Sequence, residues 1–159
     1  MGERHEHFGQ EDHHERRVKL EATRFEEMLS GESFHFFDSM MLEDIYFYYL
    51  RHNKIKNALK LVNYALQRNP YGEDLFFKRA TVLYELSRLT EAMRDVQRAL
   101  EQNPLQMEYV FLKAEILSQL GKYDGAQTEL ENYLSLTDSK EEVWFQMETD
   151  ANHQPFQTV

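Results

Sequence analysis

The sequence predicts an all-α protein built from helix-turn-helix repeats, and three observations support this prediction. The 159-residue chain has only three prolines and six glycines, so residues that interrupt helices are few. Leu, Glu, Ala, Lys, Arg and Gln dominate its middle part, and these residues favour helix. The sequence also repeats itself with a period of 34 residues, the length of two short helices and two turns.

Small residues and prolines recur at this period. Ala58, Ala92 and Ala126 are 34 residues apart from one another along the chain. The axes of packed helices lie about 8 to 10 Å apart, so a helix that packs against two neighbours needs small side chains where it crosses them. Pro70 and Pro104 share the same spacing, and proline cannot continue a helix. We therefore expect two helices in each repeat, with the second ending at a fixed position.

This pattern resembles the tetratricopeptide repeat (TPR) family, which has small residues at positions 8, 20 and 27 of each repeat and proline at position 32. The match covers Ser39 to Lys140 when the repeats are counted from Ser39, Glu73 and Met107. The resemblance implies three TPR units stacked in a right-handed superhelical α-solenoid.

Two tyrosines depart from the family pattern. Tyr46 stands at a small position of the first repeat, and Tyr133 stands at one in the third. Because tyrosine needs more room than alanine, we expect looser or rotated packing there. The phrases RFEEML, FFD and YYL also resemble the openings of long bacterial TPR proteins. A further expectation is therefore that the chain is the N-terminal part of a longer TPR protein.

Composition and register divide the chain into six predicted segments. These are a disordered His-rich tail at 1–13, an N-terminal capping helix with an aromatic join at 14–38, TPR repeats at 39–72, 73–106 and 107–140, and an incomplete fourth repeat or capping helix with a polar tail at 141–159. The join contains Phe34, Phe36 and Phe37, which we expect to pack into the array because three exposed aromatic rings in one loop are unfavourable.

Charge and missing motifs exclude several classes of function. The formal net charge of −10 argues against a nucleic-acid binder, which needs a basic surface. The absence of cysteine excludes thiol chemistry, and no phosphate-binding loop, GxSxG or HExxH motif is present. The longest apolar run, residues 45–50, is too short to span a membrane. We therefore predict a cytoplasmic non-enzyme with no cofactor, no metal, no nucleic-acid partner and no membrane partner.

The histidines near the start of the chain do not change that prediction. A polar tail offers no fixed scaffold to hold metal ligands in one geometry, so we assign them to a disordered segment. They are His5, His7, His13 and His14.

The TPR resemblance also implies where a partner would bind. In this family the first helices of the repeats line a concave face that receives a segment of another protein. Carried over to this chain, the candidate groove residues are Glu43, Phe47, Leu50, Phe77, Thr81, Tyr84, Phe111, Glu115 and Ser118. An alternative is that Phe47 and Phe77 only complete the core between repeats, as aromatic residues at helical spacing often do.

The resemblance also limits which partner is expected. TPR proteins that grip the C-terminal acid of chaperones use Lys and Asn at the positions that Glu43 and Phe47 occupy here. We therefore expect a neutral-to-basic apolar segment as the ligand.

The expected function is that of a non-enzymatic protein-protein interaction scaffold. Two alternatives remain at this stage. One is a structural module that forms homo-oligomers through an open repeat end, with Trp144 and Met147 as candidate interface residues. The other is a regulatory arm of a larger protein.

Overall fold

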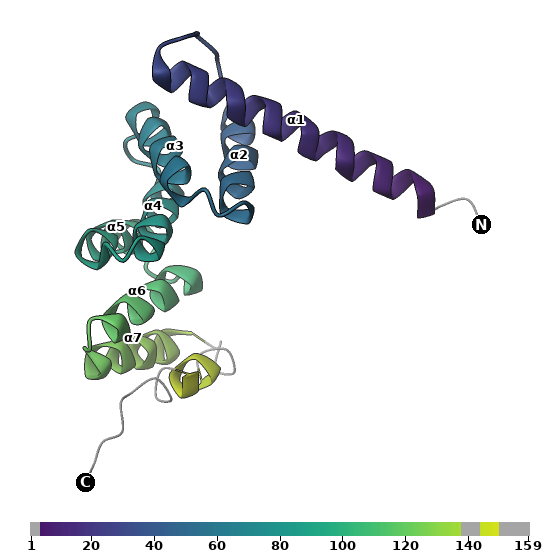
Figure 1. The fold of residues 1–159 in the computed structure, drawn as a ribbon. Helices are drawn as coiled ribbons and strands as arrows, with labels where there is room; N and C mark the ends of the chain where they lie inside the picture. Colours follow the sequence, from purple (N-terminus) through teal and green to yellow (C-terminus); the bar gives the residue numbers. More distant parts are fainter. Residues whose placement is uncertain (1–3, 138–143, 150–159) are drawn as a thin grey trace. The chain divides into compact units, whose positions relative to one another are not determined.

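The computed structural model describes residues 4–137 and 144–149, and within these ranges it contains helices and turns but no strand. The predicted all-α class is therefore confirmed. The helices labelled in Figure 1 are α1 (Arg4–Ser30), α2 (Ser39–Arg51), α3 (Ile55–Arg68), α4 (Glu73–Glu85), α5 (Leu89–Gln102), α6 (Met107–Gln119) and α7 (Tyr123–Leu136). Residues 144–149 form a further helical segment. None of the helices in the described ranges is both long and apolar enough to cross a membrane.

The chain divides into two compact units, Met1–Arg68 and Asn69–Val159. The first unit contains α1, α2 and α3. On α1, Val18, Ala22 and Phe25 follow one another at helical spacing and are fully or almost fully buried. They pack toward α2, whose Ile45 and Tyr49 are fully buried. This core joins the N-terminal helix to the first predicted repeat.

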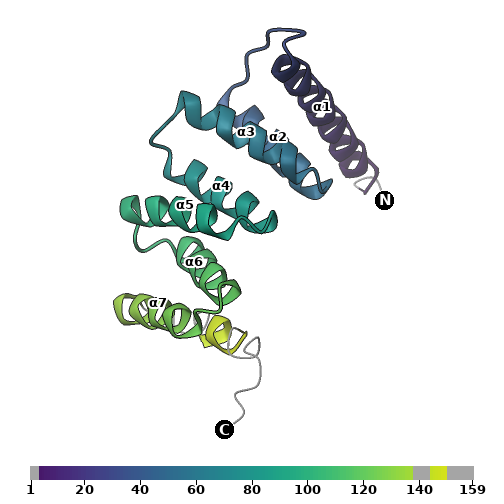
Figure 2. The same ribbon diagram turned by 60° about the vertical axis from the view of Figure 1, so that its left-hand side comes forward.

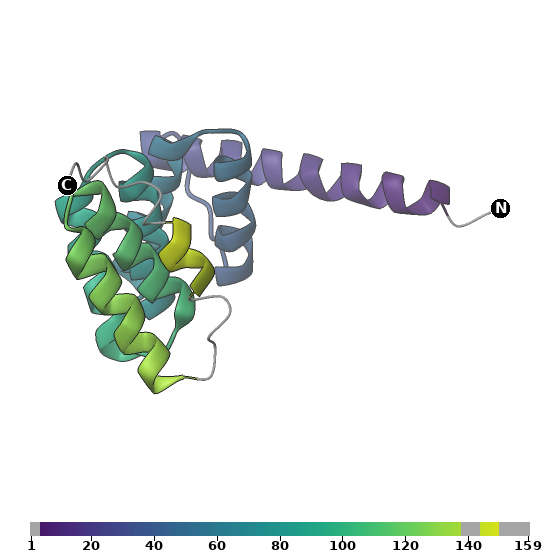
Figure 3. The same cartoon turned by 90° about the horizontal axis from the view of Figure 1, so that it is seen from below.

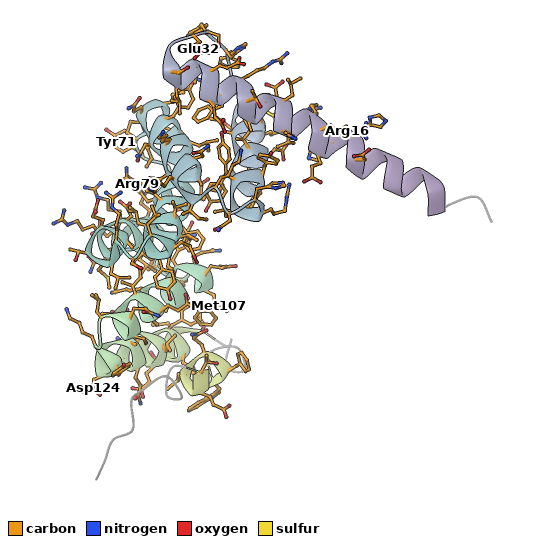
Figure 4. All side chains as sticks on the ribbon, viewed as in Figure 1. Arg16, Glu32, Tyr71, Arg79, Met107 and Asp124 are labelled. Carbon is orange, nitrogen blue, oxygen red and sulfur yellow. The ribbon has the colours of Figure 1, made fainter. Side chains whose placement is uncertain are left out.

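Helix α1 begins at Arg4, so the segment predicted as a disordered tail is helical over most of its length. The N-terminal half of this helix extends past α2 and α3 in Figures 1 and 3. Arg16, labelled in Figure 4, forms an ion pair with Asp12 one turn earlier. Both side chains are exposed. Charged helix formers and an i,i+4 ion pair can extend a helix beyond its packed part, which a tail assignment based on polarity overlooks.

The aromatic join differs from the expectation at two of its three phenylalanines. Phe37 is buried and packs edge-on against Phe25, with their ring centroids 5.7 Å apart. Phe34 and Phe36 are 86% and 74% exposed. The ring of Tyr64 also packs against Phe25, at 5.4 Å, so the aromatic site of α1 holds only one ring of the join.

One carboxylate on α1 binds polar groups of both neighbouring helices. Oε1 of Glu26 accepts hydrogen bonds from the Tyr49 hydroxyl at 3.1 Å and from Nδ2 of Asn57 at 2.9 Å. Burial, followed by the nearby Glu26 carboxylate, raises the pKa of Tyr49 above its ordinary value. These bonds satisfy polar groups that are half-buried or buried where α1 meets the α2–α3 pair.

The second unit contains two helix pairs, α4 with α5 and α6 with α7, which lie side by side in Figure 2. The core of its second pair includes the small residues Ala114 and Ala126 with Val110, Leu130 and Tyr133. Within the first unit, α2 and α3 contact each other less extensively than α4 and α5 do in the second. This agrees with the looser packing expected for the first repeat, where a buried tyrosine replaces the small residue.

The turn between the two helices of each predicted repeat has the same backbone conformation. The middle residue of each turn has a positive φ, and these residues are Asn53 (55°), Ser87 (58°) and Gly121 (74°). In each turn the next amide donates to a carbonyl five residues earlier at 2.8 Å, and these bonds are Lys54 to Tyr49, Arg88 to Leu83 and Lys122 to Leu117. This is the Schellman type of helix ending, in which glycine is the least strained residue.

Ser87 is therefore the most strained of the three turn residues, because asparagine tolerates the left-handed region better than serine. We expect Ser87→Gly to raise the free energy of unfolding by about 1 kcal/mol. The change is measured by urea unfolding followed by circular dichroism. Ser87→Ala is the matched control and should give no gain, because alanine keeps the Cβ atom. Equal gains from both substitutions would show that backbone strain is not the cause.

Opposite charges on the two helices of a repeat form ion pairs at equivalent positions. Arg79 on α4 donates to both carboxylate oxygens of Asp95 on α5, at 2.6 and 2.9 Å, and Figure 4 labels Arg79. Asp95 is only 4% exposed, and its hydrogen bond is the main cause that raises the pKa of Arg79. Thirty-four residues later, Lys113 Nζ lies 2.6 Å from Glu129 Oε1. In the first repeat the same two positions hold the apolar residues Ile45 and Leu61.

The apolar pair of the first repeat suggests a stability test of the buried ion pair. We expect Asp95→Leu alone to lower the free energy of unfolding by about 3 kcal/mol, because it removes the partner of Arg79. The double variant Arg79→Ile, Asp95→Leu should recover most of that loss, since two apolar side chains leave no unpaired charge. Urea unfolding of the two single variants and the double variant measures the coupling. Additive losses in the double variant would contradict this account.

Candidate functional site

In the first unit the candidate residues lie on one face of α2. Glu43, Phe47 and Leu50 are spaced i, i+4 and i+7, which places them along one side of a helix. Glu43 is exposed, Phe47 is 44% exposed and Leu50 is half-buried. The ring of Phe47 packs edge-on against Tyr46 with the centroids 5.3 Å apart. Phe47 therefore presents part of an aromatic surface to solvent from a helix whose opposite side is buried.

In the second unit the candidate residues of α4 have mixed roles. The ring of Phe77 packs on the ring of Tyr109 of α6, with centroids 4.7 Å apart, so it helps to hold the two helices together. The Thr81 hydroxyl donates to the backbone oxygen of Phe77 at 3.0 Å. Tyr84 is half-buried and lines a pocket. Phe77 therefore contributes to packing, whereas Tyr84 borders an open space.

The candidate residues of α6 show the same division. Phe111 packs against the buried cluster of Val110, Leu130 and their neighbours, so it is in part a core residue. Glu115 and Ser118 are half-buried and line the same pocket as Tyr84. The structure thus brings three of the nine predicted groove residues together at one place.

This pocket has a volume of about 250 Å³ and is bordered by α4, α6, the start of α7 and the helical segment 144–149. Four of its lining residues were not among the candidates, namely Gln119, Tyr123, Gln146 and Thr149. Tyr123 could have been found from the sequence, because it brings a hydroxyl group to a repeat position that is otherwise apolar, as at Ile55 and Leu89. No comparable signal marks the other three.

Carboxylates surround the aromatic contact between α4 and α6. Burial, followed by the charges of Glu73, Asp74 and Glu108, raises the pKa of Tyr109. Lys78 lies 3.4 Å from Asp74 and offsets part of this negative charge. Among the described residues, no group of three or more His, Asp or Glu side chains is arranged to hold a metal ion.

The two residues predicted at the repeat end occupy different environments. Trp144 is 59% exposed, although the residues at the same repeat position, Leu42, Phe76 and Val110, are buried. Met147 packs against the buried cluster of the α6–α7 pair. Only Trp144 of these two therefore offers a large apolar surface.

Comparison with known proteins gives a family match for the middle of the chain. The family model described as "Anaphase-promoting complex, cyclosome, subunit 3" matches residues 51–133, just over half of the 159 residues. No curated protein sequence matches the chain.

Several solved structures share the fold at low sequence identity. MamA aligns with a TM-score of 0.62 and 12% identity, over 71% of this chain and 66% of its own. The first TPR of Spaghetti (RPAP3), bound to the HSP90 peptide SRMEEVD, gives 0.62 and 18%, over 71% and 90%. The translocator chaperone SycD of Yersinia enterocolitica, solved as an alternative dimer, gives 0.62 and 19%, over 75% and 98%. These likenesses confirm the predicted TPR solenoid as the fold class.

Proposed function

The chain belongs to the tetratricopeptide repeat family described as anaphase-promoting complex, cyclosome, subunit 3, and on this basis we propose that it is a non-enzymatic protein-interaction scaffold. In this proposal the outward faces of the first helices, α2, α4 and α6, bind a segment of a partner protein. The related fold of RPAP3 has been solved with a bound peptide, which supports a peptide-binding role for this one.

The observation that carries the proposal is the meeting of Tyr84, Glu115 and Ser118 at one pocket of the second unit. These residues come from two different helices, and each stands at a position that the repeat pattern assigns to the binding face. A half-buried tyrosine beside a pocket is a suitable anchor, because it offers a large contact area and a hydroxyl group at a low cost in side-chain entropy. In the first unit, Phe47 offers a second aromatic anchor on α2.

The proposed scaffold acts in the cytoplasm and uses neither nucleic acid nor membrane as its partner. Its net charge of −10 opposes binding to phosphate backbones and to anionic lipids. Binding by preorganised helices requires little ordering of the scaffold itself, so most of the entropy loss falls on the partner segment.

The proposal predicts that peptides bind through Tyr84. Random peptides displayed on phage are selected against the purified chain, and a selected peptide is then titrated by fluorescence anisotropy. We expect Tyr84→Ala to weaken binding by about tenfold or more, as loss of an anchor residue does. Tyr71→Ala is the matched control, because Tyr71 is an exposed tyrosine outside the proposed face, and it should change affinity less than about twofold.

Two checks separate this result from other causes. Circular dichroism melting shows whether each variant is folded, and light scattering over a range of concentrations shows whether Trp144-mediated self-association competes with peptide binding. A folded Tyr84→Ala variant that binds the selected peptide as tightly as the wild type would contradict the proposed face. So would a selection that yields no binding peptide.

A further inference from the structure

We propose that the 250 Å³ pocket of the second unit is a specificity pocket for one basic side chain, lysine or arginine, of the partner segment. This inference rests on the proposed function and adds the chemistry that the site recognises. The pocket lies within the second unit, so its walls belong to one compact body.

The lining of the pocket is polar and carries charge of one sign. Glu115 supplies a carboxylate, and the lining contains no lysine, arginine or histidine. Hydroxyl groups and side-chain amides make up the other polar groups, and all of them have an oxygen that can accept a hydrogen bond. The residues that bear them are Tyr84, Ser118, Gln119, Tyr123, Gln146 and Thr149. A ring of acceptors with a single negative charge suits a cationic group with several N–H donors.

Ser118 gives independent support for a missing partner. Its Oγ atom is buried and forms no hydrogen bond within the described part of the chain. A buried hydroxyl without a partner costs about 1 to 3 kcal/mol, so a group that satisfies it contributes to binding. Rotation of serine about χ1 between staggered positions can turn the hydroxyl toward the pocket. An ammonium or guanidinium group has donors available for that oxygen.

The surrounding face of α4 and α6 carries the same sign of charge. Asp74, Glu85 and Glu108 are exposed and stand at helical spacing with the pocket residues of their helices. Basic residues are absent from the binding positions of both helices, although Lys78 pairs with Asp74 from the side. Such a face attracts a basic segment and repels an acidic one. It therefore differs from the site in RPAP3, which is occupied by the acidic peptide SRMEEVD.

The size of the pocket favours a side chain over a complete small molecule. Sites for small molecules and cofactors have volumes of about 300 to 1,000 Å³, and this pocket lies below that range. The flanking apolar and aromatic groups of α4 and α6 would contact the neighbouring residues of the same segment.

The test uses the full chain, labelled with nitrogen-15, and three small probes. These are the N-acetyl, C-methylamide derivatives of arginine, lysine and citrulline, the last of which matches the shape of arginine without its charge. We expect arginine or lysine to shift the amide resonances of Glu115, Ser118 and Gln119 in a saturable way, and citrulline to bind about tenfold more weakly. Higher salt should weaken the cationic probes and leave citrulline unchanged.

Two variants locate the effect on the protein. Glu115→Gln keeps the shape of the side chain and should remove most of the preference for arginine over citrulline. Glu101→Gln makes the same charge change at an exposed position of α5, and it should leave the preference intact. Equal binding of arginine, lysine and citrulline by the wild type would overturn the inference. So would a preference that survives Glu115→Gln, or cation-dependent shifts confined to residues outside the pocket.

Failure of this inference and failure of the proposed function give different results. If the selected peptide depends on Tyr84 but none of the probes shifts the pocket resonances, the scaffold function stands and the basic-side-chain pocket is wrong. If no peptide depends on Tyr84 and no probe binds, both are wrong.

Discussion

The close approach of paired helices at small residues is the constraint on which the rest of this structure depends. Ala58, Ala92 and Ala126 recur every 34 residues and are at most 1% exposed. Because these alanines let helices pack closely, they determine which side of each helix is buried. The opposite side of the first helix in each repeat is then left for other uses. Closely similar Schellman turns at Asn53 and Ser87 keep this register from one repeat to the next.

Much of the fold follows from sequence periodicity, because the repeat signal is carried by residues that pack locally. The register, the alanine positions and the turns could all be predicted from it. Long-range choices could not. The pairing of Arg79 with Asp95 links two helices through side chains sixteen residues apart, and the first repeat holds apolar residues at the same positions. Similarly, only tertiary packing decides that Phe37 is buried while Phe34 and Phe36 remain exposed.

The candidate site was only partly predictable for the same reason. Repeat position correctly indicated that Tyr84, Glu115 and Ser118 share a helix face, but it could not show that they line one pocket. That pocket also needs Tyr123 from the next helix and Gln146 from the segment that follows. In Phe77 and Phe111, residues at binding positions also serve the packing of the unit, so a helical pattern alone does not separate the two roles.

The same fold can therefore carry opposite binding preferences. Alanine columns and turns specify the solenoid, whereas a few outward positions specify the partner, and the two sets of residues hardly overlap. Here the outward positions of α4 and α6 are acidic and aromatic, while RPAP3 shares the fold and binds an acidic peptide.

The most direct test of this account is photo-cross-linking with a selected peptide that carries one benzoylphenylalanine, followed by mass spectrometry of the cross-linked fragments. The account predicts that cross-links in the second unit fall on α4 and α6, around Tyr84 and Ser118. Cross-links confined to α5 and α7 would show that the partner binds the second helices of the repeats, and would contradict the proposed binding face.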